Sequence, residues 1–224
     1  MKKVIVITGG SDGLGKSLAK ELMQENDVII LSTNEEKMKN IGCPYYVCDI
    51  RNFEIVQSVI DKILKDYGHI DVLVNNAGLW TYGELVDNDS KLIEEIIQVN
   101  LLGLINCTKA VVPSMKERKD GLIIQINSQS GISAKEERTI YNASKWGVTG
   151  FSKSLQLELM KYGIRVTDVR PGRMKTSLFI KNGIKKEPSG LDLEQVIRTI
   201  QFVIETSKDV LIPEIGIVSM KLVK

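Results

Sequence analysis

The chain has 224 residues, of which 43% are hydrophobic and 26% charged, and its 30 Lys and Arg against 28 Asp and Glu leave a formal net charge of +2. This composition is typical of a globular protein and excludes a disordered or collagen-like chain. The near balance of charge argues against nucleic-acid binding, which needs a basic surplus on one face. The single histidine excludes metal sites built from several histidines. We expect one domain over residues 1–224, with no metal site.

The three cysteines, Cys43, Cys48 and Cys107, show no spacing typical of a disulfide framework. The apolar run Val4–Ile7 near the N-terminus is too short for a signal-peptide core or a membrane span. An odd number of cysteines without a leader is typical of reduced thiols. We therefore expect a cytoplasmic protein that has no membrane partner.

Short apolar runs alternate with longer helical patterns along the chain. The first six predicted strands are Lys3–Thr8, Val28–Ser32, Tyr45–Cys48, Val72–Asn75, Leu122–Asn127 and Arg165–Arg170. A seventh strand is predicted at about Val210–Ile212. The helical patterns between them cover residues 14–25, 34–40, 52–67, 90–117, 140–161 and 192–206. Such alternation predicts a Rossmann-like, doubly wound parallel sheet of about seven strands with helices on both faces.

The first predicted strand runs into the glycine-rich segment Thr8–Ser17, where three motifs overlap. Gly10–Ser17 fits the phosphate loop G-x-x-x-x-G-K-S/T, and Gly9–Gly13 fits the hydrolase elbow G-x-S-x-G. Gly9, Gly13 and Gly15 fit the dinucleotide loop T-G-x-x-x-G-x-G. All three motifs use a strand, a turn and a helix to bring backbone close to a ligand, with anions at the helix N-terminus.

The rest of the chain discriminates among these motifs only in part. A hydrolase triad needs a histidine late in the chain, and His69 precedes most of the predicted sheet. A phosphate loop needs a metal-holding acid after another apolar strand, and Asp49 follows the third predicted strand. A nucleotide triphosphatase therefore stands at this point as an alternative to a dinucleotide-binding protein.

A second group of polar residues lies in the later half of the chain. Tyr141 and Lys145 form Y-x-x-x-K at the start of the predicted helix 140–161, and a spacing of four places both on one helical face. Ser128 lies 13 residues before Tyr141, at the end of the fifth predicted strand. Ligands bind at such strand ends in open α/β sheets. Asn100 interrupts the apolar pattern of helix 90–117.

These motifs, together with Asn75–Gly78 and Pro171–Thr176, stand in the order and spacing of the short-chain dehydrogenase/reductase family, which the chain resembles from Lys3 through Thr176. The resemblance implies a carbonyl–alcohol oxidoreductase that uses a nicotinamide cofactor and a small-molecule substrate. A non-catalytic dinucleotide-binding regulator on the same fold is a further alternative. Its usual hallmark would be a broken catalytic set, whereas the set here is present.

The resemblance also implies the roles of the catalytic residues. Tyr141 would exchange a proton with the substrate, and Ser128 would orient the substrate oxygen. Lys145 would hydrogen-bond the nicotinamide ribose, and Asn100 would hold a water that supplies protons. A cation beside Tyr141 would lower its pKa from the usual value of about 10.

The cofactor contacts are assigned by the same resemblance. They are Gly9, Ser11, Gly13, Leu14, Gly15, Ser32, Thr33, Asn34, Asp49, Ile50, Asn76, Ala77, Gly78, Tyr141, Lys145, Pro171, Gly172, Met174 and Thr176.

The tip of the second strand favours NADP over NAD as the cofactor. An acid at this tip would accept from the 2′-hydroxyl of NAD and repel the 2′-phosphate of NADP, and the segment Leu31–Asn34 contains none. Thr33 and Asp12 stand where NADP-using relatives often carry a basic residue, but Lys16 and Lys37 lie nearby in sequence. We expect NADP(H), with NAD(H) as the alternative.

The substrate is a carbonyl or alcohol compound that the sequence does not identify. We expect its pocket to be lined by Trp80, Tyr82, Gly131–Arg138 and a substrate loop over residues 176–190. Lys181, Lys185 and Lys186 in that loop either attract an acidic substrate or form a solvated face.

The predicted helices 90–117 and 140–161 are apolar on more than one face, although covering a sheet needs only one apolar stripe. We therefore expect a homodimer or homotetramer.

Overall fold

The computed structural model describes residues 2–176 and 190–222. Within these residues, parallel strands form one seven-stranded sheet in the order β3-β2-β1-β4-β5-β6-β7. The strands are β1 Val4–Thr8, β2 Asp27–Ser32, β3 Tyr45–Val47, β4 Val72–Asn75, β5 Gly121–Ile126, β6 Ile164–Pro171 and β7 Glu214–Ile217. This order, with β1 and β4 adjacent at the centre, confirms the doubly wound fold. It also creates a crevice where the winding reverses direction.

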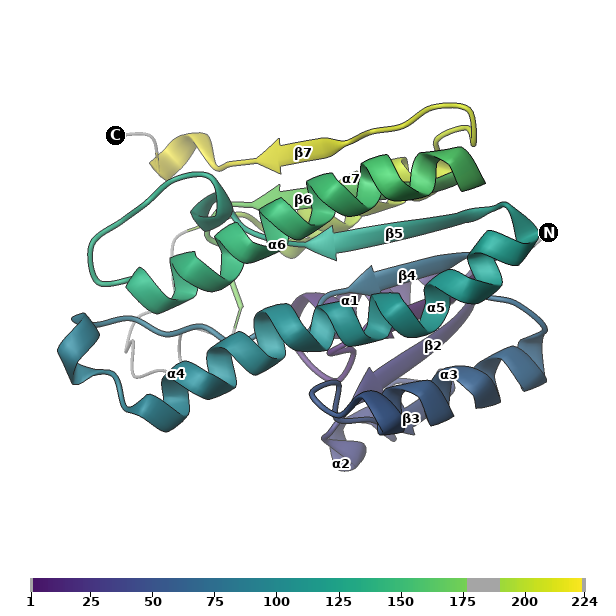
Figure 1. Cartoon of the computed structure of the whole chain (residues 1–224), viewed down its shortest axis with the longest axis horizontal. Coiled ribbons are helices and arrows are strands. Elements are labelled where there is room, and N and C mark those ends of the chain that lie inside the picture. The colour runs from purple at the N-terminus through teal and green to yellow at the C-terminus, as the bar shows by residue number, and fades with distance from the viewer. Residues whose placement is uncertain (1, 177–189, 223–224) are drawn as a thin grey trace.

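Helices connect successive strands and cover both faces of the sheet (Figure 1). They are α1 Gly13–Leu22, α2 Glu35–Met38, α3 Phe53–Tyr67, α4 Ser90–Ile97, α5 Leu104–Arg118, α6 Thr139–Leu159 and α7 Leu193–Glu205. Short 3-10 turns lie at Leu85–Asp87, Gln129–Gly131, Met160–Tyr162 and Met220–Leu222. The strand arrowheads in Figure 1 point the same way, so the loops that follow the strands gather at one end of the molecule.

The side chains of β1 show how the two faces are filled. Ile5 and Ile7 pack with α1 and α7 in one core, whereas Val4 and Val6 pack with α3, α5 and α6 in the other. Successive strand residues point to opposite faces. A strand buried on both sides is therefore apolar along its length: all five residues of β1 are buried, and four of them, Val4–Ile7, are apolar.

The predicted helix 90–117 is a helical run interrupted by a π-helical segment, Gln98–Gly103. Asn100 lies in this segment, and its side chain bonds the backbone of Leu79. A π segment is a common feature of functional sites because it re-aims one side chain within a helix. The whole run Ser90–Arg118 is long and apolar enough to cross a membrane by length and composition alone, but 56% of its most apolar window is buried inside the fold.

The last strand begins later than the sequence predicts. It covers Glu214–Ile217, whereas the predicted strand Val210–Ile212 has no regular structure. Asp168 of β6 donates its N–H to the carbonyl of Pro213 at 3.0 Å. Pro213 has no N–H with which to extend the parallel ladder back toward Val166, whose carbonyl accepts from the Gln156 side chain instead, so the ladder between β6 and β7 starts with the pair Asp168–Glu214.

The predicted substrate loop over residues 176–190 lies almost wholly outside the described residues. Backbone hydrogen bonds join the described residues on the two sides of this loop. Lys175 donates to the carbonyl of Leu191 at 3.0 Å, Leu191 donates to the carbonyl of Arg173 at 2.8 Å, and Met174 and Leu191 form an isolated parallel bridge.

Candidate active site

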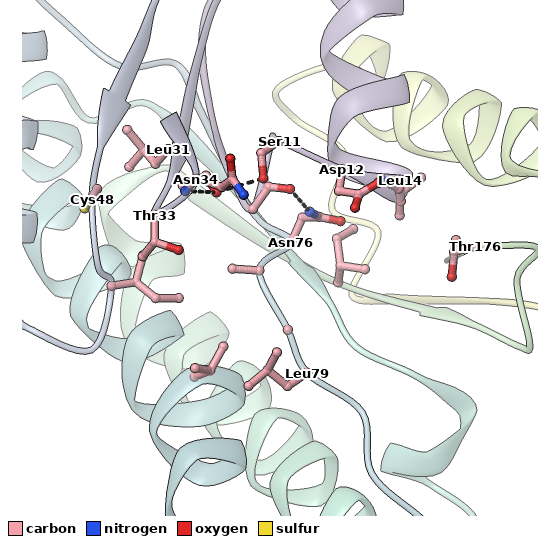
Figure 2. Close-up of a pocket in the computed structure, with 18 of the residues that line it drawn as sticks. Ser11, Asp12, Leu14, Leu31, Thr33, Asn34, Cys48, Asn76, Leu79 and Thr176 are labelled. Atoms are coloured by element: carbon pink, nitrogen blue, oxygen red, sulfur yellow. Dashed lines mark hydrogen bonds between the residues drawn. The ribbon is translucent and has the colours of Figure 1, made fainter. Parts of the chain in front are cut away.

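A cavity of about 400 Å³ lies at the carboxyl ends of the central strands, and many of the predicted cofactor residues line it. In Figure 2, Thr33 and Cys48 lie toward one end of it, Leu14 and Thr176 toward the other, and Asn34, Ser11 and Asn76 between them. The predicted residues that line the cavity are Gly9, Ser11, Gly13, Leu14, Ser32, Thr33, Asn34, Asp49, Ile50, Asn76, Ala77, Gly78, Tyr141, Lys145, Met174 and Thr176.

The glycine loop needs its glycines for two separate reasons. Gly9 and Gly13 have φ angles of +66° and +51°, a left-handed conformation that side chains disfavour. Gly15 does not line the cavity; a Cβ there would lie 2.5 Å from the Asn76 amide nitrogen and 2.5 Å from the Gly9 carbonyl oxygen. Asp12 caps α1 by accepting from the Gly13 N–H at 2.8 Å. The loop therefore leads tightly into a helix N-terminus that faces the cavity, where anions are favoured.

Thr8 and Asn76 fasten this loop to the end of β4. The Thr8 hydroxyl oxygen accepts from the N–H groups of Asn76 and Ala77, both at 3.0 Å. The Asn76 amide donates back to the carbonyls of Thr8 at 2.9 Å and Gly9 at 3.3 Å. The two cavity walls thus form one hydrogen-bonded unit, which accounts for asparagine at this strand end.

The tip of β2 forms a polar wall of the cavity. Among the described residues, no acidic side chain at this wall lacks a partner. The hydroxyls of Ser11 and Ser32 lie 2.8 Å apart, and Ser32 also accepts from the Asn34 N–H at 3.3 Å. The Lys37 ammonium, which lines the cavity, pairs with the Asp12 carboxylate at 2.8 Å. Asp12 and Lys37 together place no net charge at this wall.

Asp49 and Ile50 line the cavity after β3, as predicted. The Asp49 carboxylate accepts from the Arg51 guanidinium at 2.6 to 3.0 Å, and this contact holds the Asp49 pKa below its usual range. The side-chain amide of Asn106 donates a hydrogen bond to the Ile50 carbonyl at 2.9 Å. These bonds hold the chain after β3 against the side of the cavity.

Tyr141 and Lys145 lie at the other end of the cavity, one turn apart on α6. Both are buried, and the Lys145 ammonium donates to the Ile126 carbonyl at 3.0 Å. Burial lowers the Lys145 pKa to about 8, while the Asp168 carboxylate acts in the opposite direction. Burial raises the Tyr141 pKa, while the hydrogen bond with Ser128 and the charge of Arg138 oppose the rise.

The predicted lowering of the Tyr141 pKa is therefore wrong for the protein without cofactor. The Lys145 ammonium lies 5.9 Å from the centre of the tyrosine ring, above its face. At this position desolvation of the phenol outweighs the attraction of nearby cations.

Ser128 and Asn100 lie beside the cavity rather than in its lining. Ser128 hydrogen-bonds Tyr141 and accepts from the Ser130 N–H at 3.1 Å. The Asn100 amide is buried; it accepts from the Leu79 N–H at 2.7 Å and donates to the Leu79 carbonyl at 2.9 Å and the Ser144 hydroxyl at 3.1 Å. These bonds place Leu79, which does line the cavity. The water-holding role of Asn100 stays a prediction.

Pro171 and Gly172 do not line the cavity either. Pro171 ends β6, and Gly172 donates to the Ile217 carbonyl at 2.7 Å, which directs the following residues back over the site. Met174 and Thr176 reach the cavity as a result.

The sequence analysis missed part of the lining, namely Leu31, Cys48, Arg51, Leu79, Glu95, Val99, Ile126 and Asn127. Leu31, Cys48, Ile126 and Asn127 each lie in a predicted strand that contains a named site residue or is directly followed by one. Extending each motif by one residue would have found Leu31, Cys48 and Asn127, as well as Arg51 and Leu79, and extending it by two would have found Ile126. Glu95 and Val99 come from the helical run before Asn100 and carry no motif.

A buried polar network lies behind Lys145. Asn127 donates to the Asp168 carboxylate at 3.2 Å and to the Thr149 hydroxyl at 2.9 Å. Asp168 also accepts from the Arg170 guanidinium at 2.9 Å, and the same guanidinium donates to the Glu214 carboxylate of β7 at 2.7 Å. Asp168 and Arg170 are 1% and 4% exposed, so the pair is largely shielded from water.

The two aromatic residues predicted for the substrate pocket differ in exposure, and their place in that pocket stays a prediction. Trp80 is buried, whereas Tyr82 is 52% exposed, and their rings stack with centres 5.8 Å apart. Neither lines the cavity. Lys16, which a phosphate loop would turn toward a nucleotide, is also absent from the lining, which argues against the triphosphatase alternative.

A buried polar atom tests whether a dinucleotide fits here. The Thr176 hydroxyl is shielded from solvent and has no hydrogen-bond partner among the described residues. Its side chain faces Gly13, since a Cβ built on Gly13 would lie 3.9 Å from Thr176. A phosphate at the N-terminus of α1 would supply an acceptor for this hydroxyl, so the residues present fit a dinucleotide.

Comparison with known proteins agrees with this geometry. A family model described as short chain dehydrogenase matches residues 3–187. The 3-oxoacyl-(acyl-carrier-protein) reductase of Thermotoga maritima is 35% identical over 186 residues, covering 79% of this chain and 76% of that protein. Carbonyl reductase family member 4 of Xenopus tropicalis is 33% identical over 220 residues, covering 92% of each chain.

Solved structures show the same fold. The closed form of serine dehydrogenase complexed with NADP⁺ matches with a TM-score of 0.92 and 26% identity, covering 97% of this chain and 95% of that one. ElxO with NADP bound matches with a TM-score of 0.89 and 29% identity, covering 97% of both chains.

Proposed function

Because the chain belongs to the short-chain dehydrogenase/reductase family of NAD(P)-dependent oxidoreductases, we propose that it transfers a hydride between NADP(H) and a carbonyl or alcohol substrate. One observation carries the proposal: Tyr141 and Lys145 open onto the same cavity as the glycine loop and the tip of β2. A proton donor and a dinucleotide site in one cavity are the parts that carbonyl reduction needs.

The proposed cofactor residues divide by position along the cavity. The N-terminus of α1, with Gly13 and Leu14, would hold the pyrophosphate, and Thr176 would donate to it. The polar wall of Ser32, Thr33 and Asn34 would bind the adenosine ribose. Lys145, at the reactive end, would hydrogen-bond the nicotinamide ribose. The nicotinamide supplies the hydride in reduction and accepts it in oxidation.

Tyr141 would donate its phenolic proton to the substrate oxygen as negative charge develops there. Ser128, which already hydrogen-bonds Tyr141, would donate to the same oxygen and stabilise that charge. The raised Tyr141 pKa keeps the phenol protonated at neutral pH, which suits a proton donor in reduction. For oxidation the phenolate is needed, and the Lys145 ammonium would favour it electrostatically.

Two features of the β2 tip support NADP over NAD. The tip Leu31–Asn34 lacks a carboxylate, and the hydroxyls of Ser11 and Ser32 beside it can donate to phosphate. Asp12 neutralises Lys37, so the wall neither repels nor strongly attracts the 2′-phosphate. ElxO and serine dehydrogenase bind NADP in solved structures. Titration of fluorescence with each cofactor should give tighter binding of NADPH than of NADH; the reverse order would refute this preference.

The same proposal includes a cytoplasmic homodimer or homotetramer. Helix α6 packs against α4 and against the π segment that follows α4. Large apolar side chains on these elements are exposed: Trp146 (51%) and Leu157 (75%) in α6, Met160 (54%) directly after it, and Leu102 (44%) in the π segment. Exposed apolar side chains on neighbouring elements are consistent with an interface. The molecular mass measured by light scattering at micromolar protein concentration should exceed the 25.0 kDa of the monomer. A measured mass equal to that of the monomer would contradict the proposed assembly.

The test of the reaction is a screen of NADPH and NADH oxidation against a panel of carbonyl compounds, followed by Tyr141→Phe. This variant removes one oxygen and keeps the ring. Turnover should fall by about 10²- to 10⁴-fold, the usual effect of losing a general acid, while NADPH binding persists. Tyr45→Phe, a matched change far from Lys145 in the chain, is the control. Near-full activity of Tyr141→Phe on a verified substrate would show that the active site is assigned wrongly.

A further inference from the structure

Arg138 lies beside the proposed proton donor. It occupies the N-cap position of α6, with a non-helical backbone conformation, and precedes Tyr141 by three residues. Its side chain makes no hydrogen bond to the helix end. Its charge acts directly on the phenol, where it favours the phenolate. The Arg138 guanidinium therefore lies within electrostatic reach of the place where the substrate oxygen must bind.

The backbone before Arg138 is held in an uncommon conformation. Glu137 has a φ of +56°, and its carbonyl accepts from the Gly83 N–H at 2.8 Å. A non-glycine residue with positive φ costs energy and persists only where surrounding contacts impose it. The bond to Gly83 is such a contact. It ties the chain before α6 to the segment that carries Tyr82, and so fixes where Arg138 enters the helix.

The Arg138 guanidinium is half-buried, and in the described part of the chain it has no ion pair or hydrogen bond. Burial lowers its pKa, and the neighbouring Arg173 guanidinium adds to this effect. Tyr141 and Glu137 only partly offset it. A buried charge without a partner is costly, and a bound anion would relieve this cost.

We propose that Arg138 binds a carboxylate of the substrate, so that the enzyme acts on small oxo acids and on the corresponding hydroxy acids. This inference rests on the proposed function. Guanidinium presents two parallel N–H donors that match a carboxylate. Since Arg138 precedes Tyr141 by three residues and its charge acts on the phenol, a substrate that meets both groups would carry its carboxylate only a few bonds from the carbonyl carbon.

The experiment compares each acid with its uncharged ester. Reduction of 2-oxo, 3-oxo and 4-oxo acids of four or five carbons is measured against their methyl esters, for the parent protein and for Arg138→Gln. The parent should prefer one acid over its ester by at least about tenfold in kcat/KM. Arg138→Gln should lower kcat/KM for that acid by about 10- to 100-fold, the usual effect of losing a charge-assisted bond, and bring the acid-to-ester ratio near one. Arg138→Lys should restore part of the preference.

Lys135→Gln is the matched control, because Lys135 is an exposed cation three residues earlier in the same segment. It should leave the acid-to-ester ratio unchanged, whereas a general effect of surface charge would lower it too. Protection of each variant by NADPH against thermal unfolding verifies that it is folded. Equal turnover of acid and ester by the parent, or an equal loss for both in Arg138→Gln, would overturn the carboxylate site alone. If the parent protein reduces none of the carbonyl compounds, the proposed function itself is overturned.

Discussion

Replacing Lys145 with methionine is expected to stabilise the folded protein while removing its activity. Lys145 is 5% exposed, and burial lowers its pKa from 10.5 to about 8. Between pH 8 and 10.5 the unfolded chain therefore binds more protons than the folded chain, so stability rises with pH across this window. Below pH 8 the full cost of burying the ammonium is present.

The size of this cost follows from the two pKa values. They differ by about 2.5, and each pH unit corresponds to about 1.4 kcal/mol, which gives about 3 kcal/mol at neutral pH. Methionine has a similar length and no charge, but it gives up the hydrogen bond to the Ile126 carbonyl, worth about 1 kcal/mol. We expect Lys145→Met to be more stable than the parent by about 2 kcal/mol at pH 7, with the difference disappearing toward pH 10.

Urea unfolding at pH 7, 8, 9 and 10 measures this difference directly. Lys153→Met on the exposed side of the same helix is the control, and its stability relative to the parent should not follow this pH dependence. The same Lys145 variant should bind NADPH more weakly and lose turnover, as expected when a functional residue is kept at the expense of stability. A Lys145→Met protein that is less stable than the parent at pH 7, or a difference that does not change with pH, would refute the reasoning.

Further substitutions test the surroundings of the site. Asp168→Ala should cost about 1.5–3 kcal/mol in urea unfolding because it removes one of the two carboxylates that pair with the buried Arg170, while Glu214 stays. Adding Arg170→Met should recover part of this loss; a double variant no more stable than the single one would contradict this. Gly15→Ala should destabilise by about 1–3 kcal/mol and weaken NADPH binding because its Cβ meets backbone and amide at 2.5 Å. Gly150→Ala, with nothing within 4 Å of its Cβ, should instead gain about 0.5–1 kcal/mol. Thr33→Asp should reverse the cofactor preference toward NADH by repelling the 2′-phosphate; an unchanged ratio of dissociation constants would refute the assignment of this wall.

The strands and the motif residues of the cavity could be predicted because they depend on local patterns. A strand buried on both faces needs apolar residues throughout, as in Val4–Ile7, and a tight turn into a helix needs glycine, as at Gly9 and Gly13. These requirements are visible in sequence without any tertiary contact. The parallel topology follows from the alternation of such strands with helices.

The features that sequence analysis missed depend on partners far apart in the chain. Asn100 appears in the sequence as a polar residue in an apolar helix, but its bonds to Leu79 require the folded arrangement. The raised Tyr141 pKa depends on how completely packing excludes water, which no motif spacing encodes. The start of β7 depends on Pro213 meeting Asp168, a pairing between residues 45 positions apart.

The backbone bonds that join Arg173 and Lys175 to Leu191 have a consequence for protein engineering. The chain departs from the sheet and returns to it at two points held together by the described residues themselves, so residues 177–189 do not have to bring these points together. Doubling the length of a flexible segment adds only about 0.6 kcal/mol to the entropic cost of closing it. A sequence of another length or composition between these two points is therefore expected to leave the sheet and the cavity unchanged, which makes this a suitable position for inserting a new segment.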